Sequence, residues 1–291
     1  MHTVAEIADV RQQIQQCRQS GLRISFIPTM GDLHDGHISL IKAAKERAEI
    51  VVVSIFANPL QYDNPEEAVP LKNLESDQAK LIEANVDILY TPSTESLYPN
   101  GFDLKTYVGM PDLFQLLDNS YRPNYFRGVA TATLKLLNIV QPDMIVLGKK
   151  NYQHLTIIRQ MITDLSLNID VVTVPIVRDM DGVAISYRNE FLTIDERQRA
   201  PVVARTIRWV SSQIRGGRND YQELVLDATD QLRAAGFYPK GITICDAYSL
   251  LPVSSESNKL VILMKASIGH ITLTDNLSVD IVSKEELTEA E

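Results

Sequence analysis

The sequence predicts an α/β protein: a doubly wound parallel sheet followed by a smaller C-terminal α+β domain. Short apolar runs that fit buried strands alternate with amphipathic helical segments as far as Pro175. Beyond that point the alternation weakens, and two helical segments precede a strand-rich tail. We therefore expect two domains, residues 1–177 and 178–291, with the boundary near Val177–Asp181.

The individual elements follow from hydrophobic periodicity. Apolar residues at helical spacing from Val4 to Cys17 predict an opening amphipathic helix. Five apolar runs predict strands, at 24–27, 50–56, 86–90, 144–147 and 169–174. The helices expected between them are 38–48, 73–85 with Asn73 as its N-cap, 129–139 and 152–163. In the second domain we expect helices at 195–213 and 221–235 and strands at 242–244, 260–264 and 271–273.

Composition excludes several classes of protein. The 291 residues include 28 Lys and Arg against 37 Asp and Glu, so the net charge of −9 argues against a protein that wraps nucleic acid. The two cysteines, Cys17 and Cys245, are too few for a disulfide framework or a Cys-based zinc site. No signal peptide begins the sequence, and the longest apolar run is too short to span a membrane. We expect a cytoplasmic protein with no nucleic-acid or membrane partner.

The first candidate site is the segment PTMGDLHDGH, residues 28–37, which follows a strand and opens a helix. Ligands of open parallel sheets bind at the carboxyl ends of strands, and a helix N-terminus there favours phosphate. Gly31 and Gly36 permit close approach of the backbone to a ligand. His34 and His37 are three residues apart, so both face one point and could donate hydrogen bonds to phosphate oxygens.

Two other interpretations of this histidine pair stay open on local grounds. The pair could bind a metal, although no third Cys or His lies nearby, or it could merely cap a buried helix. Neither a G-x-G-x-x-G nor a G-x-x-x-x-G-K-[ST] motif occurs in the chain. If the protein binds a nucleotide, the histidine motif must therefore hold it.

Three further segments carry polar groups where strands are expected to end. SIFANPLQ, residues 54–61, supplies Asn58 and Gln61, which suit a small polar organic substrate, although a plain strand exit at Asn-Pro explains it equally well. GKKNYQH, residues 148–154, places two lysines at a strand end, for which a solvated face is the alternative. RDMDGVAISYRN, residues 178–189, adds Ser186 and Arg188, a hydroxyl and a guanidinium suited to phosphate.

Together these motifs resemble the pantothenate synthetase (pantoate–β-alanine ligase) family. The matching stretches fall in family order and cover nearly the whole chain: PTMGDLHDGH, VVVSIFANPLQY, FRGVATATLKLLNIVQPD, GKKNYQHLTIIRQM, RDMDGVAISYRNEFLT and CDAYSLLPV. The resemblance implies a Rossmann-like nucleotidyltransferase domain with a HIGH-like signature, residues 34–37, and a KMSKS-like segment, residues 185–188. It also implies two steps: pantoate attacks the α-phosphate of ATP to give pantoyl adenylate and pyrophosphate, and the β-alanine amine then releases AMP and pantothenate.

The resemblance also implies roles for particular residues. The catalytic residues would be His34, His37, Lys150 and Arg188, with His37 as general acid. ATP would contact Met30, Gly31, Asp32, Leu33, His34, Asp35, Gly36, His37, Gly148, Lys149, Lys150, Asn151, Val177, Ile185, Ser186, Tyr187 and Arg188. Pantoate and β-alanine would contact Asn58, Gln61, Tyr125 and His154. Asp77 matches a position that binds Mg²⁺, and family members are typically homodimers.

The chain departs from the family pattern at four positions. Asn151 stands where a carboxylate is usual, His154 where a glutamine binds pantoate, Tyr125 where a histidine is usual, and Tyr187 where a serine is usual. The phosphate-binding groups are kept while the acid pocket changes. Two alternatives to pantothenate formation follow: a related AMP-forming ligase with another small hydroxy acid or amine, and a homologue that binds nucleotide without turnover.

Overall fold

The computed structural model describes residues 1–62, 73–102, 106–110 and 125–281. Two compact units divide the chain: the first is Met1–Pro175 and the second starts at Ile176, beside the expected boundary at residue 177. No helix of the described ranges combines the length and apolar character that crossing a membrane requires.

The first unit is built on a six-stranded sheet whose neighbouring strands all run parallel. Its order is β1-β4-β3-β2-β5-β6, with β1 His2–Val4, β2 Ile24–Thr29, β3 Ile50–Ile55, β4 Ile88–Tyr90, β5 Met144–Gly148 and β6 Asp170–Val174. The central strands are buried on both faces, which is why they read as unbroken apolar runs. The predicted α/β, doubly wound fold class is confirmed.

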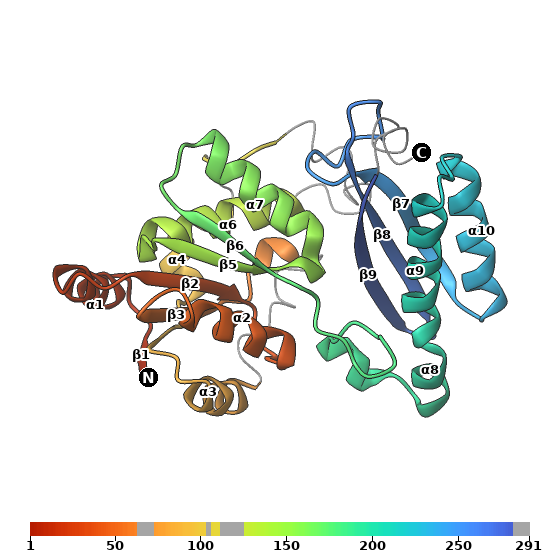
Figure 1. Ribbon diagram of the computed structural model, residues 1–291. Helices are drawn as coiled ribbons and strands as arrows, with labels where there is room; N and C mark the ends of the chain where they lie inside the picture. Colours follow the sequence, from red (N-terminus) through yellow and green to blue (C-terminus); the bar gives the residue numbers. More distant parts are fainter. Residues whose placement is uncertain (63–72, 103–105, 111–124, 282–291) are drawn as a thin grey trace. The chain divides into compact units, whose positions relative to one another are not determined.

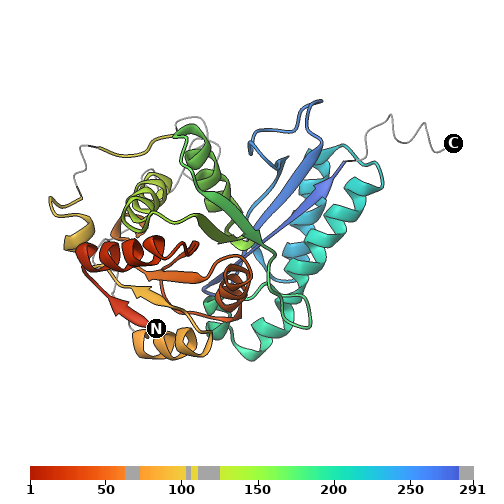
Figure 2. The same cartoon turned by 60° about the vertical axis from the view of Figure 1, so that its left-hand side comes forward.

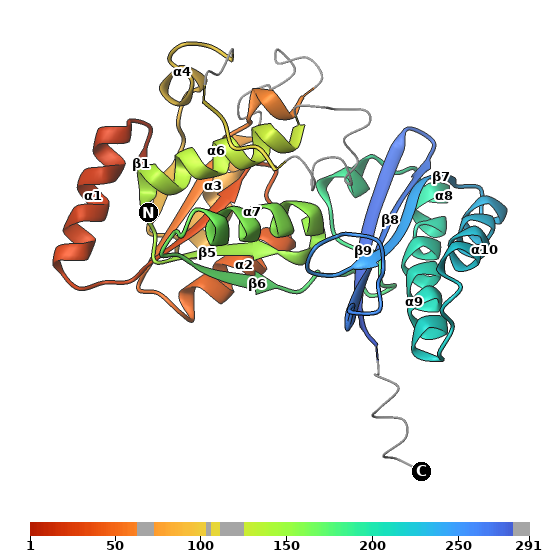
Figure 3. The ribbon, with the colours of Figure 1, turned by 90° about the horizontal axis from the view of Figure 1, so that it is seen from above.

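Helices cover both faces of this sheet (Figure 1). α2 (Asp35–Lys45) and α3 (Leu74–Glu83) lie on one face, and α6 (Tyr125–Val140) and α7 (Tyr152–Asp164) lie side by side on the other (Figure 3). The remaining helical elements are α1 (Ile7–Gln19), α4 (Thr94–Leu97) and the short 3₁₀ turns η1 (Pro59–Gln61) and η3 (Lys149–Asn151).

The second unit packs two helices on a three-stranded antiparallel sheet (Figure 2). It comprises η4 (Tyr187–Phe191), α8 (Ile194–Arg199), α9 (Pro201–Arg215), α10 (Tyr221–Ala234), β7 (Tyr238–Asp246), β8 (Lys259–Ile268) and β9 (Ile271–Asp280). One face of the sheet and the apolar sides of α9 and α10 share a single buried core. This is the expected smaller α+β unit.

The observed elements differ from the expected ones in three ways. Val4 belongs to the edge strand β1, which pairs with β4, instead of the opening helix. The helix expected at 195–213 is two helices, because Pro201 has no N–H to continue α8 and begins α9. The strands of the second unit extend well past their apolar centres, since ladder pairing carries their polar ends along.

Candidate functional site

The strand order fixes where a ligand site lies in the first unit. The chain passes from β2 through β3 to β4 in one direction and then returns to place β5 on the other side of β2. The order therefore reverses between β2 and β5, and the crevice beyond their carboxyl ends is where such sheets bind ligands. β2 leads into residues 30–37 and β5 into Gly148–Asn151, so the topology brings together two of the predicted motifs.

The loop after β2 adopts an unusual backbone. Gly31 and Asp32 have φ angles of 90° and 52°, so two successive residues lie in the left-handed region. Gly31 takes this conformation without a steric penalty, whereas Asp32 does so at a cost on the order of 1 kcal/mol. A Cβ on Gly31 would lie 3.3 Å from Asp77 Oδ2 and 3.4 Å from Ile55 Cγ2. The glycine thus lets the loop lie close to α3 and β3.

Side chains at and on α3 hold this loop. The Leu33 N–H donates to Asp77 Oδ1 at 2.8 Å, and the Lys80 ammonium donates to the Leu33 carbonyl. The Asn73 amide donates to Asp32 Oδ1 at 2.7 Å. Asn73 is the N-cap residue of α3, as predicted, but its side chain makes no capping hydrogen bond and binds the loop instead. The loop is therefore clamped from a helix that begins some forty residues away.

His34 and His37 support each other at the start of α2. His34 is the N-cap; its Nδ1 accepts the Gly36 N–H at 3.1 Å, while His37 Nδ1 accepts the His34 N–H at 3.2 Å. The ring centroids are 4.2 Å apart. Because each Nδ1 accepts a hydrogen bond, each neutral imidazole must carry its proton on Nε2. Both rings are thus fixed as Nε2–H donors, which is what phosphate oxygens require. The capping interpretation and the phosphate interpretation are therefore compatible.

Charge and burial keep His37 neutral. Burial is the largest cause that lowers its pKa to about 3, followed by His34, Lys80 and Lys150. An imidazole in this state donates a hydrogen bond without carrying a charge. The effect of Lys150 also places that ammonium within electrostatic reach of His37, so the motif after β5 does converge with the histidine motif.

The other residues of these two motifs surround the pair. Met30 is exposed, Asp32 and Asp35 are exposed, and Leu33 is buried at 2%. Lys149 and Lys150 are partly buried in η3, and Asn151 is exposed at the start of α7. A Cβ on Gly36 would lie 2.7 Å from His34 Cε1, so only glycine leaves the imidazole its place.

Asn58 and Gln61 belong to a hydrogen-bond network at the end of β3. Asn58, 1% exposed, donates to Gln61 Oε1 and to the Gly128 carbonyl, each at 3.1 Å, and accepts from the Tyr98 hydroxyl at 3.0 Å. Gln61 Nε2 in turn lies 3.6 Å from Met30 Sδ, which links this network to the loop after β2. Asn58 orients Gln61, and Gln61 lies beside the first motif.

Tyr125 and His154 form a pair between α6 and α7. The Tyr125 hydroxyl and His154 Nε2 are 3.0 Å apart, and the ring of Phe126 meets that of His154 edge-on. Burial lowers the pKa of His154 to about 4, so this imidazole is neutral as well. The two departures from the family pattern are thus one interacting unit.

Asp77 is a buried carboxylate that faces the loop after β2. It is 2% exposed, burial raises its pKa, and hydrogen bonds from Leu33 and Asp32 oppose that rise. The described residues contain no group of three or more His, Cys, Asp or Glu side chains placed to hold a metal. Mg²⁺ is commonly bound through one carboxylate together with substrate phosphates, and Asp77 Oδ2, which faces Gly31, fits that arrangement.

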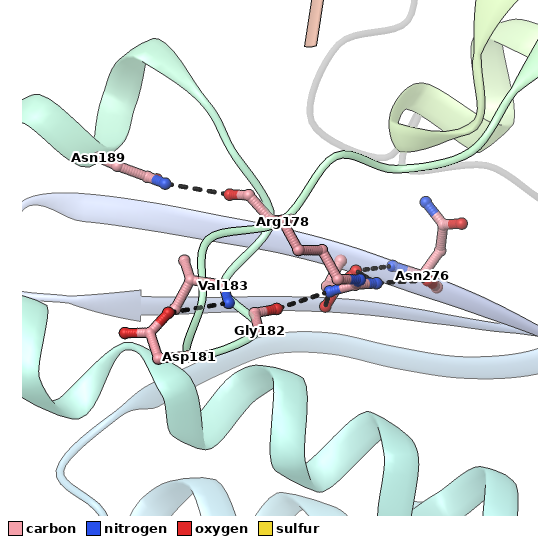
Figure 4. Close-up of polar contacts among 8 residues, drawn as sticks. Arg178, Asp181, Gly182, Val183, Asn189 and Asn276 are labelled. Atoms are coloured by element: carbon pink, nitrogen blue, oxygen red, sulfur yellow. Dashed lines mark hydrogen bonds and ion pairs between the residues drawn. The ribbon is translucent and has the colours of Figure 1, made fainter. Parts of the chain in front are cut away.

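In the second unit, the fourth motif folds into a hairpin held by ion pairs (Figure 4). Arg178 binds Asp275 through both oxygens, at 2.7 and 2.8 Å, and donates to the Gly182 carbonyl. Arg197 binds Asp179 at 2.9 Å and Asp181 at 2.5 Å. Gly182 has a φ of 91° in the turn, and the guanidinium of Arg208 occupies the place that a Cβ would need.

This hairpin leads directly to the remaining predicted ATP contacts. The Ile185 N–H donates to the Val177 carbonyl at 3.0 Å, and Ser186 caps η4 by accepting the Arg188 N–H. The Asn189 amide donates to the Ala184 carbonyl at 3.0 Å (Figure 4). Tyr187 and Arg188 are exposed, with the Arg188 guanidinium 5.5 Å from the centre of the Tyr187 ring.

Sequence reasoning missed the groups that hold these segments: Lys80, Tyr98 and the Arg178–Asp275 pair. Asp77 and Lys80 do share the i, i+3 spacing of one helix face, which is a weak signal. Their target is the backbone of another segment, so the spacing alone could not reveal it.

The fold and the first-unit site define a class of protein. It is a doubly wound α/β protein whose H-x-G-H loop, where the strand order reverses between β2 and β5, is suited to binding anions. A model of the family "Pantoate-beta-alanine ligase" matches residues 2–278, so the chain belongs to this family and is a ligase enzyme.

Relatives of known name match the chain over nearly its whole length. The chain is 52% identical to a pantothenate synthetase of Photobacterium profundum, covering 97% of this chain and 96% of the relative. A crystal structure of pantothenate synthetase from Thermus thermophilus has a TM-score of 0.83 at 35% identity, covering 95% and 99%. A pantoate-β-alanine ligase from Francisella tularensis, complexed with "Beta-gamma ATP and Beta-alanine", has a TM-score of 0.75 at 30% identity, covering 95% and 97%. The family resemblance is confirmed, and neither alternative to pantothenate formation is favoured.

Proposed function

We propose that this enzyme condenses pantoate with β-alanine in an ATP-dependent reaction that releases AMP and pyrophosphate. The observation that carries the proposal is that His34 and His37 each accept a hydrogen bond at Nδ1, which leaves Nε2 as the donor, where the strand order of this family member reverses. The ATP and β-alanine named for the Francisella tularensis relative support the substrates.

In the first step, a pantoate carboxylate oxygen attacks the α-phosphate and pyrophosphate leaves. Negative charge builds up on the phosphate oxygens, and donors aimed at them stabilise the transition state. His34, His37 and Lys150 would supply these donors from the first unit, with Ser186 and Arg188 from the second. Burial keeps the pKa of His37 near 3, so its imidazole is neutral. We therefore propose that His37 acts first as a hydrogen-bond donor, and that any proton transfer in its expected role of general acid follows.

In the second step, the β-alanine amine attacks the acyl carbon, and AMP leaves with the carboxylate oxygen that joined the two. We propose that Gln61, oriented by Asn58, and the Tyr125–His154 pair contact pantoate and β-alanine. Neutral amide and hydroxyl groups suit the hydroxyls and the carboxylate of a small acid.

Mg²⁺ would be held by the triphosphate together with Asp77. Bound there, the ion supplies charge neutralisation of the phosphate oxygens. The position of Asp77 Oδ2 beside Gly31, in the loop expected to contact ATP, supports this assignment.

Three further parts of the proposal rest on the resemblance: a homodimer, a cytoplasmic location, and a lid role for residues 178–291 over the ATP. Light scattering on the purified protein tests the first, and ATP-dependent protection of residues 178–191 in hydrogen exchange tests the third.

ATP–pyrophosphate exchange with pantoate, followed by amide formation with β-alanine, tests the reaction. Exchange and pantothenate formation are expected. Exchange only with another acid would instead favour a related ligase of different specificity. Nucleotide binding without exchange for any acid would favour a homologue that binds nucleotide without turnover.

A further inference from the structure

Helix α3 binds both backbone polar groups of one residue, Leu33. Asp77 Oδ1 accepts its N–H at 2.8 Å, and the Lys80 ammonium donates to its carbonyl. The two side chains are one helical turn apart, so they grip the peptide from one helix face. The Leu33 side chain, 2% exposed, is anchored in the apolar core of the first unit.

The backbone just before Leu33 has a conformation that must be held by neighbouring groups. Asp32 lies at a φ of 52°, which a non-glycine residue adopts only when its surroundings hold it there. Its carboxylate accepts the Asn73 amide at 2.7 Å, a third contact from the same side of the loop. Strained backbone of this kind concentrates at functional sites, where the fold fixes a geometry that the free chain would leave.

The segment after Leu33 carries the chemistry. His34 follows directly and caps α2, and His37 Nδ1 accepts the N–H of His34. A displacement of the Leu33 peptide therefore moves the His34 N–H, and with it the hydrogen bond that fixes the His37 ring. The ammonium of Lys80 is also close enough to act on His37 electrostatically.

We propose that Lys80 is a positioning residue for the reaction: with Asn73, it fixes the loop at residues 31–34 so that the imidazoles of His34 and His37 meet the nucleotide phosphates. This inference rests on the proposed function for its substrate, ATP. Lys80 lies outside the motifs that carry the family resemblance, and its distance along the sequence from the histidines hides it.

The test compares Lys80→Met with Lys45→Met. Lys45 is a matched control, because it is a partly buried lysine of the same unit that binds Asp87 at 2.7 Å, at the far end of α2 from the histidines. The readouts are the dissociation constant of ATP, the KM for ATP in pyrophosphate exchange and the melting temperature. We expect Lys80→Met to raise both ATP constants about tenfold. Lys45→Met should stay within about twofold of the parent while losing a similar amount of melting temperature.

Two more variants keep the proposal falsifiable if Lys80→Met does not fold. Lys80→Arg keeps a cationic donor and should recover most of the lost ATP affinity. Asn73→Ala removes an exposed contact, so it should raise the ATP constants by about threefold with little change in melting temperature. ATP constants unchanged in Lys80→Met and Asn73→Ala would overturn the proposal and leave α3 a purely structural support.

Imidazole ¹⁵N spectra give a readout that a loss of stability does not move. Both rings should show Nε2–H tautomers in the parent and in Lys45→Met, and the His37 pattern should change in Lys80→Met. An unchanged pattern would also contradict the proposal. Failure of the proposed function is distinguishable, because ATP binding and the tautomers can be measured even if no acid supports exchange.

Discussion

The loop at residues 30–37 and the segment at residues 176–191 are both expected to contact ATP, and they are held in different ways. The loop is fixed from within the core: its Leu33 is buried, α3 binds its backbone, and burial lowers the pKa of His37. The segment is fixed at its base by guanidinium–carboxylate pairs, and its residues Tyr187 and Arg188 are exposed.

This difference has a physical consequence. Preorganised donors in a desolvated site require little reorganisation when charge develops, which suits the group nearest the reacting phosphate. An exposed arginine on an anchored hairpin can be rearranged at little cost, which suits a group that closes on a substrate after it binds. The two regions should therefore respond differently to substitution, as follows from the largest effect to the smallest.

Replacement of His37 should have the largest effect. His37→Ala removes a preorganised donor, so adenylation measured by pyrophosphate exchange should fall by about 10² to 10³. His270→Ala, which truncates an exposed histidine of the second unit, serves as control and should leave exchange unchanged. A near-normal exchange rate in His37→Ala would contradict a role for His37 as a donor in adenylation.

Loss of the ion pair at the base of the hairpin should come next. Arg178→Met leaves Asp275, whose side chain is 2% exposed, without its partner. Because an uncompensated buried carboxylate is costly, the free energy of unfolding of the second unit should fall by about 3 kcal/mol. Hydrogen exchange of the amides in β8 and β9, followed along a urea titration, measures this free energy of unfolding. A loss below about 1 kcal/mol would show that the pair is not the anchor.

Acid should weaken the first region before the second. The folded-state pKa values of His37 and His154, about 3 and about 4, lie below their ordinary value, so the unfolded chain binds protons first as the pH falls. Their contribution to stability is complete above about pH 6.5 and is lost as the pH falls toward the folded values. At pH 5 each histidine should reduce stability by about 2 kcal/mol.

Urea titrations at pH 7.5 and pH 5 check this pH dependence. His37→Gln and His154→Gln should each lose less stability than the parent between these two pH values, whereas the exposed His270→Gln should behave like the parent. Equal losses in all four proteins would mean that neither imidazole is held neutral by burial.

The smallest effect should follow from the outer ion pairs of the hairpin. The Arg197 side chain is 34% exposed and its partners Asp179 and Asp181 about as much, so Arg197→Ala should cost less than about 1 kcal/mol. Differential scanning calorimetry at low and high salt checks it, since salt should remove most of this contribution in the parent. A larger, salt-independent loss of stability would mean that these ion pairs of Arg197 contribute as much as the Arg178–Asp275 pair.

The sequence was informative wherever a pattern is local. Buried strands read as apolar runs, and the H-D-G-H spacing put two imidazoles at a helix start because both features depend on neighbouring residues. β1 was not predictable, since three residues carry no periodicity and pair only because β4 offers its edge. Asn73 was predictable as the N-cap residue of α3, but the hydrogen bond from its amide to Asp32 was not.

Contacts between distant residues lay beyond prediction. Arg178 and Asp275 are 97 residues apart, and Lys80 meets the backbone of Leu33 across 47. The interaction of Tyr125 with His154 depends on how α6 packs on α7, which no spacing encodes. The residues expected to bind ligands could therefore be named from the sequence, but the groups that position them could not.

The transfer of ¹⁸O from carboxyl-labelled pantoate tests the central claim most directly. An adenylate intermediate joins a carboxylate oxygen to the α-phosphorus, and attack by the β-alanine amine at the acyl carbon leaves that oxygen on AMP. Mass spectrometry of the products should find one ¹⁸O in AMP and none in pyrophosphate. Unlabelled AMP, or label in inorganic phosphate alongside ADP, would contradict the account.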